Sequence, residues 1–92
     1  MNKRRILLVY DCDDWKSYDS MRLAFATTSV RRWRSFIISK IERGDFVYGD
    51  PEDTAKKQSE RFKEHFDVKP LSYLDGLLKF GFLDYVYDGE EI

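Results

Sequence analysis

Residues 5–11, with the sequence RILLVYD, decide the fold of this chain because they contain its longest apolar run. The run is short, rich in residues that favour strands, and ends at an acidic loop. A continuous apolar segment of this kind is typical of a central strand that is covered on both faces. Basic residues precede the run, but no small-residue cleavage site follows it, so we expect a strand and not a signal peptide. The run is also far too short to span a membrane.

The polar residues that follow predict a long loop and a second strand. Residues 12–21 carry mostly charged and hydroxyl side chains, as loops do. Residues 22–27 alternate weakly, with Leu23 and Phe25 on one face and two alanines on the other. Two short strands joined by a polar connection predict an antiparallel pair.

The clearest helix lies between residues 29 and 43. Thr28 or Ser29 is suited to cap its N-terminus, and Gly44 is suited to end it. Its apolar stripe has helical spacing and consists of Val30, Trp33, Ile37 and Ile41.

A brief strand and a second helix are predicted next. Residues 46–48 are apolar and precede a glycine, which predicts the strand. Asp50 is suited to cap a helix with Pro51 in its first turn, and this helix is expected to run to about Phe66.

The remaining residues predict a third helix and a last strand. Ser72 and Asp75 have the spacing of a capping box, and we expect this short, leucine-rich helix to end at Gly81. Residues 82–87 predict the last strand, and residues 88–92 form an acidic tail.

The order of elements is therefore β-β-α-β-α-α-β, which predicts an α+β fold in a single domain over residues 1–92. We expect one mixed or antiparallel sheet of three to four strands covered by helices. No internal repeat, linker or low-complexity segment interrupts this order.

Composition excludes several classes of protein. The chain has 92 residues, with 16 Lys and Arg against 17 Asp and Glu, and a formal net charge of −1. This balance excludes a uniformly basic nucleic-acid coat protein and a uniformly acidic DNA mimic. One cysteine and one histidine exclude a disulfide framework, a cysteine-based zinc site and most catalytic triads. The free Cys12 fits the reducing cytoplasm, where we expect the protein to be located.

Three aspartates after the first strand are the main candidates for chemistry. Asp11, Asp13 and Asp14 follow an apolar strand, where α/β enzymes often hold Mg²⁺ with several carboxylate oxygens. The alternative interpretation is that these aspartates solvate the loop and balance nearby arginines. We favour that alternative, and expect no cofactor, because short acidic motifs are weak signals.

Enzymatic activity has little support in the sequence. Cys12 has only His65 as a candidate base, and His65 lies among charged residues near a helix end, where a solvated or dipole-facing histidine is expected. The five glycines are scattered, so no glycine-rich phosphate loop exists. We therefore expect a protein without catalytic residues.

The near-neutral total hides a dipolar chain. Residues 1–43 carry ten basic and five acidic side chains, whereas residues 44–92 carry six basic and twelve acidic ones. The candidate nucleic-acid contacts in the basic half are Arg31, Arg32, Arg34 and Arg43. We favour the alternative that these arginines pair with acids of the second half within the fold.

The acidic half ends with aromatic residues, a combination that a basic groove on a partner protein would recognise. The predicted contacts are Asp84, Tyr85, Tyr87, Asp88, Glu90 and Glu91. Trp15 and Tyr18 in the polar loop are a second place where aromatic side chains are suited to anchor a partner. The alternative interpretation of the acidic end is a solubilising tail.

Three segments of the chain resemble small proteins of Firmicutes phages and integrative elements. The segments are DDWKSYDS at residues 13–20, LAFATTSVRRWRSFIISKIERGDFVYGD at residues 23–50 and FLDYVYDGEEI at residues 82–92. That group has a Phe-x-Thr segment before a helix, then Gly-Asp-Phe-x-Tyr-Gly, and Asp-Gly-Glu at the end. The resemblance implies no catalytic residue. It implies a protein that acts by binding a host or phage protein, and inhibitors of host defence, anti-CRISPR proteins among them, are one such class.

Three functional hypotheses follow. The preferred one is a non-enzymatic inhibitor that occupies the basic nucleic-acid site of a host-defence nuclease, through a protein partner and without a membrane. The second is a small nucleic-acid-binding accessory protein that uses the arginine-rich helix. The third is metal-dependent phosphotransfer or nuclease activity at the acidic loop.

Overall fold

Three α-helices and five strands build the part of the chain, residues 4–88, that the computed structural model describes. The elements in chain order are β1 (Arg4–Asp11), a 3₁₀ turn (Tyr18–Ser20), β2 (Arg22–Thr27), α1 (Val30–Glu42), β3 (Val47–Tyr48), α2 (Ala55–Phe66), α3 (Leu71–Leu77), β4 (Leu78–Lys79) and β5 (Gly81–Asp88). The predicted α+β class is confirmed. The prediction of one sheet is wrong, because β3 lies in a separate two-stranded antiparallel sheet with the strand β4, which was not predicted.

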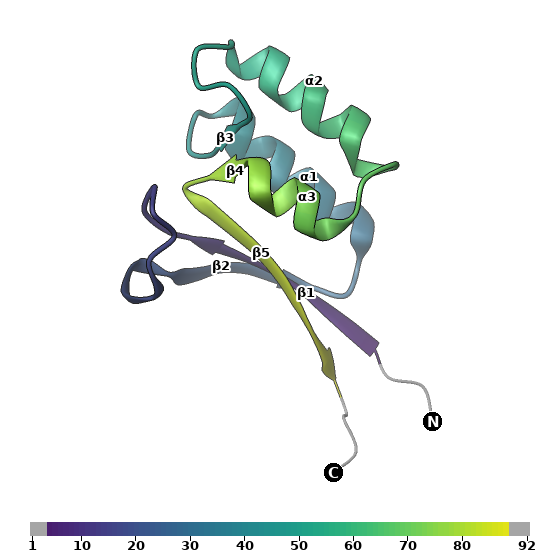
Figure 1. Cartoon of the computed structure of the whole chain (residues 1–92). Coiled ribbons are helices and arrows are strands. Elements are labelled where there is room, and N and C mark those ends of the chain that lie inside the picture. Colours follow the sequence, from purple (N-terminus) through teal and green to yellow (C-terminus); the bar gives the residue numbers. More distant parts are fainter. Residues whose placement is uncertain (1–3, 89–92) are drawn as a thin grey trace.

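β1 is the central strand of the larger sheet, as predicted. The strand order is β2-β1-β5, and β1 is antiparallel to both neighbours. Leu7 pairs with Thr27 on one side and with Tyr85 on the other. The first and last strands of the chain therefore lie side by side, as Figure 1 shows.

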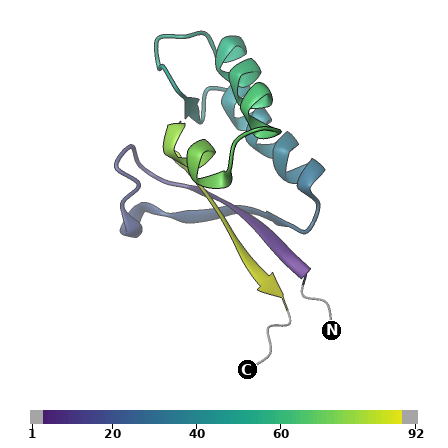
Figure 2. The ribbon, with the colours of Figure 1, turned by 45° about the vertical axis from the view of Figure 1, so that its right-hand side comes forward.

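The helices lie on one side of this sheet, so β1 is not covered by helices on both faces as predicted, although Leu8 on the other face is buried. Figures 1 and 2 show α1, α2 and α3 above the sheet and no helix below it in the described part of the chain. Leu7 and Val9 point toward the helices and join a core with Trp33 and Ile37. The alternate residues of β1 point to the opposite face, which we call the outer face.

The prediction that Leu23 and Phe25 share one face of β2 is wrong because the strand contains a β-bulge. Val9 pairs with Phe25, but the next residue, Tyr10, pairs with Leu23, so Ala24 is left without a partner on β1. The extra residue changes the alternation of side chains along β2. Phe25 packs against the core, whereas Leu23 lies with Tyr10 on the outer face and is 60% exposed.

Helix α1 forms as its sequence pattern predicts. The Ser29 hydroxyl accepts a hydrogen bond from the Arg32 amide at 3.2 Å, which caps the first turn. The buried residues of α1 are Trp33, Ile37, Ile38 and Ile41. The Trp33 indole nitrogen also donates to the Leu8 carbonyl oxygen at 3.3 Å, which fixes α1 along the central strand.

The predicted start of the second helix is wrong by one turn. Thr54, not Asp50, caps α2, because its hydroxyl accepts from the Lys57 amide at 3.1 Å. The Asp50 carboxylate accepts from the Glu52 amide instead and closes a turn of its own. The side chain of the buried Gln58 stabilises this turn. Its amide group forms hydrogen bonds with backbone atoms before and after the turn, which keeps the chain close to β3.

The predicted capping box of the third helix is also absent. α3 begins after Pro70 without a side-chain cap and ends at Leu77, before the predicted end at Gly81. The Asp75 carboxylate turns away from its own helix and accepts from the Leu83 amide of β5 at 2.9 Å. A tertiary hydrogen bond therefore replaces the local one.

A close approach at Gly81 fixes the start of β5. A Cβ atom at this position would lie 2.7 Å from the ring atom Cζ of Phe46, which is itself buried. Phe80, the residue before it, has a φ of 68°, in the left-handed region that most residues avoid. The turn between β4 and β5 is therefore tightly constrained.

We expect the substitution Gly81→Ala to lower the free energy of unfolding by about 2 kcal/mol, because a methyl group there overlaps the Phe46 ring. The matched control is Gly76→Ala in α3, where no atom lies within 4 Å of the new methyl group. That variant should gain about 0.5–1 kcal/mol of helix stability. Urea denaturation of both variants checks this, and equal effects of the two substitutions would contradict the close approach.

Candidate functional site

The loop between β1 and β2 is held in one conformation by hydrogen bonds. The Asp13 carboxylate accepts from the Ser17 amide at 2.9 Å and from the Ser17 hydroxyl at 2.7 Å. The Asp13 amide donates to the Ser20 hydroxyl at 3.0 Å, and this hydroxyl donates to the Ser17 carbonyl oxygen at 2.8 Å. Hydrogen bonds thus connect these residues, which sequence analysis interpreted as a solvated loop.

These bonds use the aspartates that were candidates for a metal site. Both oxygens of Asp13 are occupied by Ser17, and Asp11 forms an ion pair with Lys40 at 2.9 Å. Asp14 is exposed. Across residues 4–88, no three His, Cys, Asp or Glu side chains come together in a group suited to hold a metal ion. The structure therefore gives Asp11 and Asp13 roles in holding the loop and the sheet.

Lys16 anchors the tip of the loop to the body of the protein. Its φ of 53° turns the chain sharply, and its ammonium group lies 3.1 Å from the Asp75 carboxylate. The same ammonium group donates to the Asp75 carbonyl oxygen. Because Asp75 also bonds the Leu83 amide, the loop, α3 and β5 are joined at one side chain.

The anchored loop exposes two large aromatic side chains. Trp15 is 88% exposed and Tyr18 is 91% exposed. They lie on either side of the bonded residues Lys16 and Ser17, so the backbone that carries them is ordered. Aromatic side chains held in this way are the type of residue that anchors protein interfaces.

Next to Tyr18, the outer face of the sheet is hollowed. The hollow has a volume of about 360 Å³ and is lined by Tyr10, Tyr18, Met21, Leu23, Phe82 and Asp84. We call these six residues, together with Trp15, the loop face. Sequence analysis missed most of them, although the alternation of β1 and β5 predicts that Tyr10 and Phe82 share a face that α1 does not cover.

The predicted acidic and aromatic contacts at the chain end do not form one surface. Successive residues of β5 point to opposite faces, so Asp84 lies on the outer face while Tyr85 and Tyr87 lie on the inner one. The two tyrosine rings contact each other at right angles, with centroids 5.6 Å apart. Asp88 is the last residue of β5, and its side chain, like Glu90 and Glu91, lies outside the described residues.

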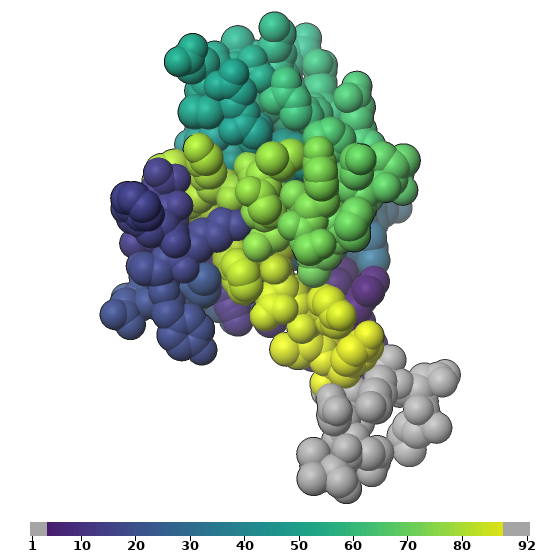
Figure 3. Space-filling model, in the orientation of Figure 1, coloured from purple at the N-terminus to yellow at the C-terminus, as the bar shows by residue number. Residues whose placement is uncertain are grey.

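The loop and the end of β5 are also far apart. Figure 3 shows the loop after β1 (dark blue) projecting on one side, away from the last residues of β5 (yellow). Of the predicted partner contacts, the structure thus brings Tyr18 and Asp84 together and leaves Tyr85 and Tyr87 elsewhere.

The four arginines of the basic half differ in their surroundings. Arg43 forms an ion pair with Asp45 at 3.5 Å, and Arg34 lies over the Phe66 ring at 5.6 Å. Arg31 and Arg32 are exposed and have no ion pair with any residue of the described range 4–88. Internal pairing, which sequence analysis favoured for these arginines, is therefore seen within residues 4–88 for Arg43 and not for the other three.

Cys12 and His65 are both held within the fold. Burial raises the pKa of the Cys12 thiol, which keeps it protonated at neutral pH. His65 lies in the last turn of α2, as the sequence predicts, but it is half-buried and shares a hydrogen bond with the Tyr48 hydroxyl at 2.9 Å, so the expectation of a solvated side chain is wrong. No hydrogen bond joins His65 to Cys12 among the residues that the structure describes.

No protein-family model, curated protein or solved structure matches this chain. Between residues 4 and 88, no helix has both the length and the apolar character needed to cross a membrane.

Because the Ser17 hydroxyl and then the Ser17 amide bond its charged form, the pKa of Asp13 lies below its ordinary value of 3.8. A carboxylate with a lowered pKa stabilises the folded loop above its ordinary pKa, and this contribution is lost as the pH falls through the lowered value. We expect the Ser17 amide resonance to stay constant from neutral pH down to about pH 4 and to move below it.

An NMR titration of the folded protein checks this, with two matched variants. Asp13→Asn should remove the acid transition of the Ser17 amide, whereas Asp14→Asn should leave it in place because Asp14 is exposed. If both variants behave alike, the loop is not held by Asp13.

Proposed function

We propose that this protein is a non-catalytic binding module that captures a protein partner through the loop face. The observation that carries the proposal is the exposure of Trp15 and Tyr18 on a loop that Asp13 and Lys16 hold in place. An ordered loop loses little conformational entropy when a partner binds, so exposed aromatic anchors on it contribute more of their contact energy to affinity.

The charges around the loop face favour a partner with basic and apolar residues. Asp14, Asp19 and Asp84 have no ion pair in the described part of the chain. The nearby cations are already engaged, since Lys16 is paired with Asp75 and Arg22 donates to backbone carbonyl oxygens. Carboxylates without an ion-pair partner in residues 4–88, next to exposed aromatic rings, complement a positively charged surface that also carries apolar side chains.

The nucleic-acid site of another protein has this chemistry. The inhibition of a host-defence nuclease, expected from the resemblance to phage and integrative-element proteins, therefore stays part of the proposal. So does the cytoplasmic location. The proposal replaces Tyr85 and Tyr87 as contacts by Tyr10, Leu23 and Phe82, because the latter share the face of Tyr18 and Asp84.

Binding through side chains is favoured over addition of a strand to β5. The Leu83 and Tyr85 amides, which do not face β1, donate to the carboxylates of Asp75 and Asp84 at 2.9 and 2.8 Å. An edge strand with two of its outward donors already bonded is a poorer template for another strand.

A second candidate function is nucleic-acid binding by α1. The observation that favours it is the hollow of about 690 Å³ beside Arg31 and Arg32, which Phe25 and Phe36 also line. The rings of Phe25 and Phe36 are stacked, with centroids 4.4 Å apart. Proteins that bind single-stranded nucleic acids often combine arginine with an exposed aromatic surface.

Selection from random short peptides displayed on phage tests the preferred function. We expect enriched peptides to combine Lys or Arg with Trp, Phe or Leu. The double variant Trp15→Ala with Tyr18→Ala should weaken binding of a synthesised enriched peptide by about thirtyfold or more. The control Tyr87→Ala, at an exposed tyrosine away from the loop face, should bind normally. Enrichment of acidic peptides, or equal loss in the control, would reject the loop face.

Fluorescence anisotropy with labelled single-stranded DNA and RNA tests the second candidate. If α1 binds nucleic acid, the double variant Arg31→Gln with Arg32→Gln should reduce the slope of log affinity against log salt by about 1.4. The variant Lys56→Gln with Lys57→Gln removes the same charge from exposed positions of α2 and should leave that slope unchanged. The absence of binding at low salt, or equal effects of both variants, would reject this candidate.

A further inference from the structure

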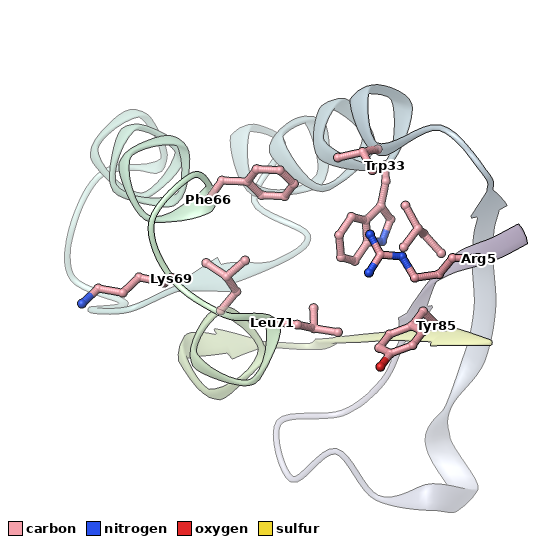
Figure 4. A pocket seen from close by; sticks show the side chains of 9 residues that line it. Arg5, Trp33, Phe66, Lys69, Leu71 and Tyr85 are labelled. Carbon is pink, nitrogen blue, oxygen red and sulfur yellow. The ribbon is translucent and has the colours of Figure 1, made fainter. Parts of the chain in front are cut away.

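On the inner face, a cavity of about 230 Å³ lies between α1, the connection from α2 to α3, and the ends of β1 and β5. Its lining includes Arg5, Leu7, Trp33, Lys69, Leu74 and Tyr85. Figure 4 shows these side chains around one space. The cavity is on the side of the sheet opposite the loop face, so it is independent of the proposed function.

The walls of the cavity are apolar and offer little to a polar ligand. Leu7, Trp33 and Leu74 are buried and form its inner surface. The one polar atom of Trp33, its indole nitrogen, already donates to the Leu8 carbonyl oxygen. A nucleotide base would leave its polar edges without partners here, which is costly, whereas a hydrocarbon chain would not.

Arg5 supplies a positive charge at the mouth. Figure 4 shows its guanidinium group between Trp33 and Tyr85, directed toward the cavity. The guanidinium carbon lies 5.5 Å from the centre of the Tyr85 ring. Arg5 forms no ion pair with the residues in the range 4–88, and no carboxylate lines the cavity. A guanidinium group at an apolar opening, with no carboxylate partner among the described residues, favours an anionic group there.

Lys69 does not share this role. Its stem lines the cavity, but Figure 4 shows its ammonium group pointing away from the other lining side chains. The ammonium nitrogen lies over the Tyr73 ring, 4.9 Å from its centre. Of the described residues that line the cavity, only Arg5 directs a cation toward it, so Lys69 is a natural control.

We propose that this cavity binds a small amphipathic anion, a straight-chain carboxylate of medium length, with its chain among Trp33, Leu7 and Leu74 and its carboxylate at Arg5. The volume is smaller than the roughly 300–1,000 Å³ of sites for drug-sized ligands and cofactors. A chain of a few methylene groups matches both the size and the apolar lining. The carboxylate and the guanidinium group form paired, charge-assisted hydrogen bonds.

A fluorescence titration tests the proposal in the background of Trp15→Phe, which leaves Trp33 as the only tryptophan. Hexanoate, octanoate and decanoate are the probes, with octanol and octylamine as neutral and cationic counterparts of octanoate. We expect affinity to rise about fourfold for each added methylene group until the chain fills the cavity. Octanoate should bind about tenfold or more tightly than octanol or octylamine.

Two surface variants show which cation is used. Arg5→Gln should weaken octanoate binding by about tenfold or more and leave octanol binding unchanged, because only the anionic group contacts Arg5. Lys69→Gln removes the same charge and should change octanoate binding by less than about twofold, as its ammonium group points away. Equal binding of octanoate and octanol, equal losses in both variants, or no binding of any chain at millimolar concentration would overturn the proposal.

Discussion

The packing of Leu7 and Val9 of β1 against α1 is the contact on which the rest of the structure depends. β1 is bonded on both edges, so these two side chains are held rigidly where Trp33 and Ile37 reach them. The bond from the Trp33 indole nitrogen to the Leu8 carbonyl oxygen then sets the position of the helix along the strand. Since α2 and α3 join the same core, all three helices gather on one face.

This one-sided arrangement creates both surfaces to which we assign binding. Side chains alternate along a strand, so each residue of β1 that enters the core leaves its neighbours on the uncovered face. The bulge at Ala24 adds Leu23 to that face and widens its apolar area. On the inner face, β1 and β5 extend beyond the helices (Figure 1), and Arg5 of β1 and Tyr85 of β5 line the cavity.

Asp75 connects the functional loop to this framework. Its carboxylate accepts from the Leu83 amide of β5 and pairs with Lys16 of the loop. One side chain thus orders the loop that exposes Trp15 and Tyr18 and also occupies an edge donor of the sheet. A network of this kind makes the loop a rigid binding element, and it protects the edge of β5 against pairing with other chains.

The sequence by itself determined the local elements: the strand from its apolar run, α1 from its helical spacing and Ser29 cap, and the α+β class from their order. The alternation of side chains along a strand also predicts that Asp84 and Tyr85 point to opposite faces. Sequence analysis grouped them because they are neighbours in the chain. Only the tertiary structure decided which face of the sheet is covered, where β2 bulges, and that Asp75 bonds β5 and not its own helix. Those outcomes depend on contacts between residues distant in the chain, which no local pattern encodes.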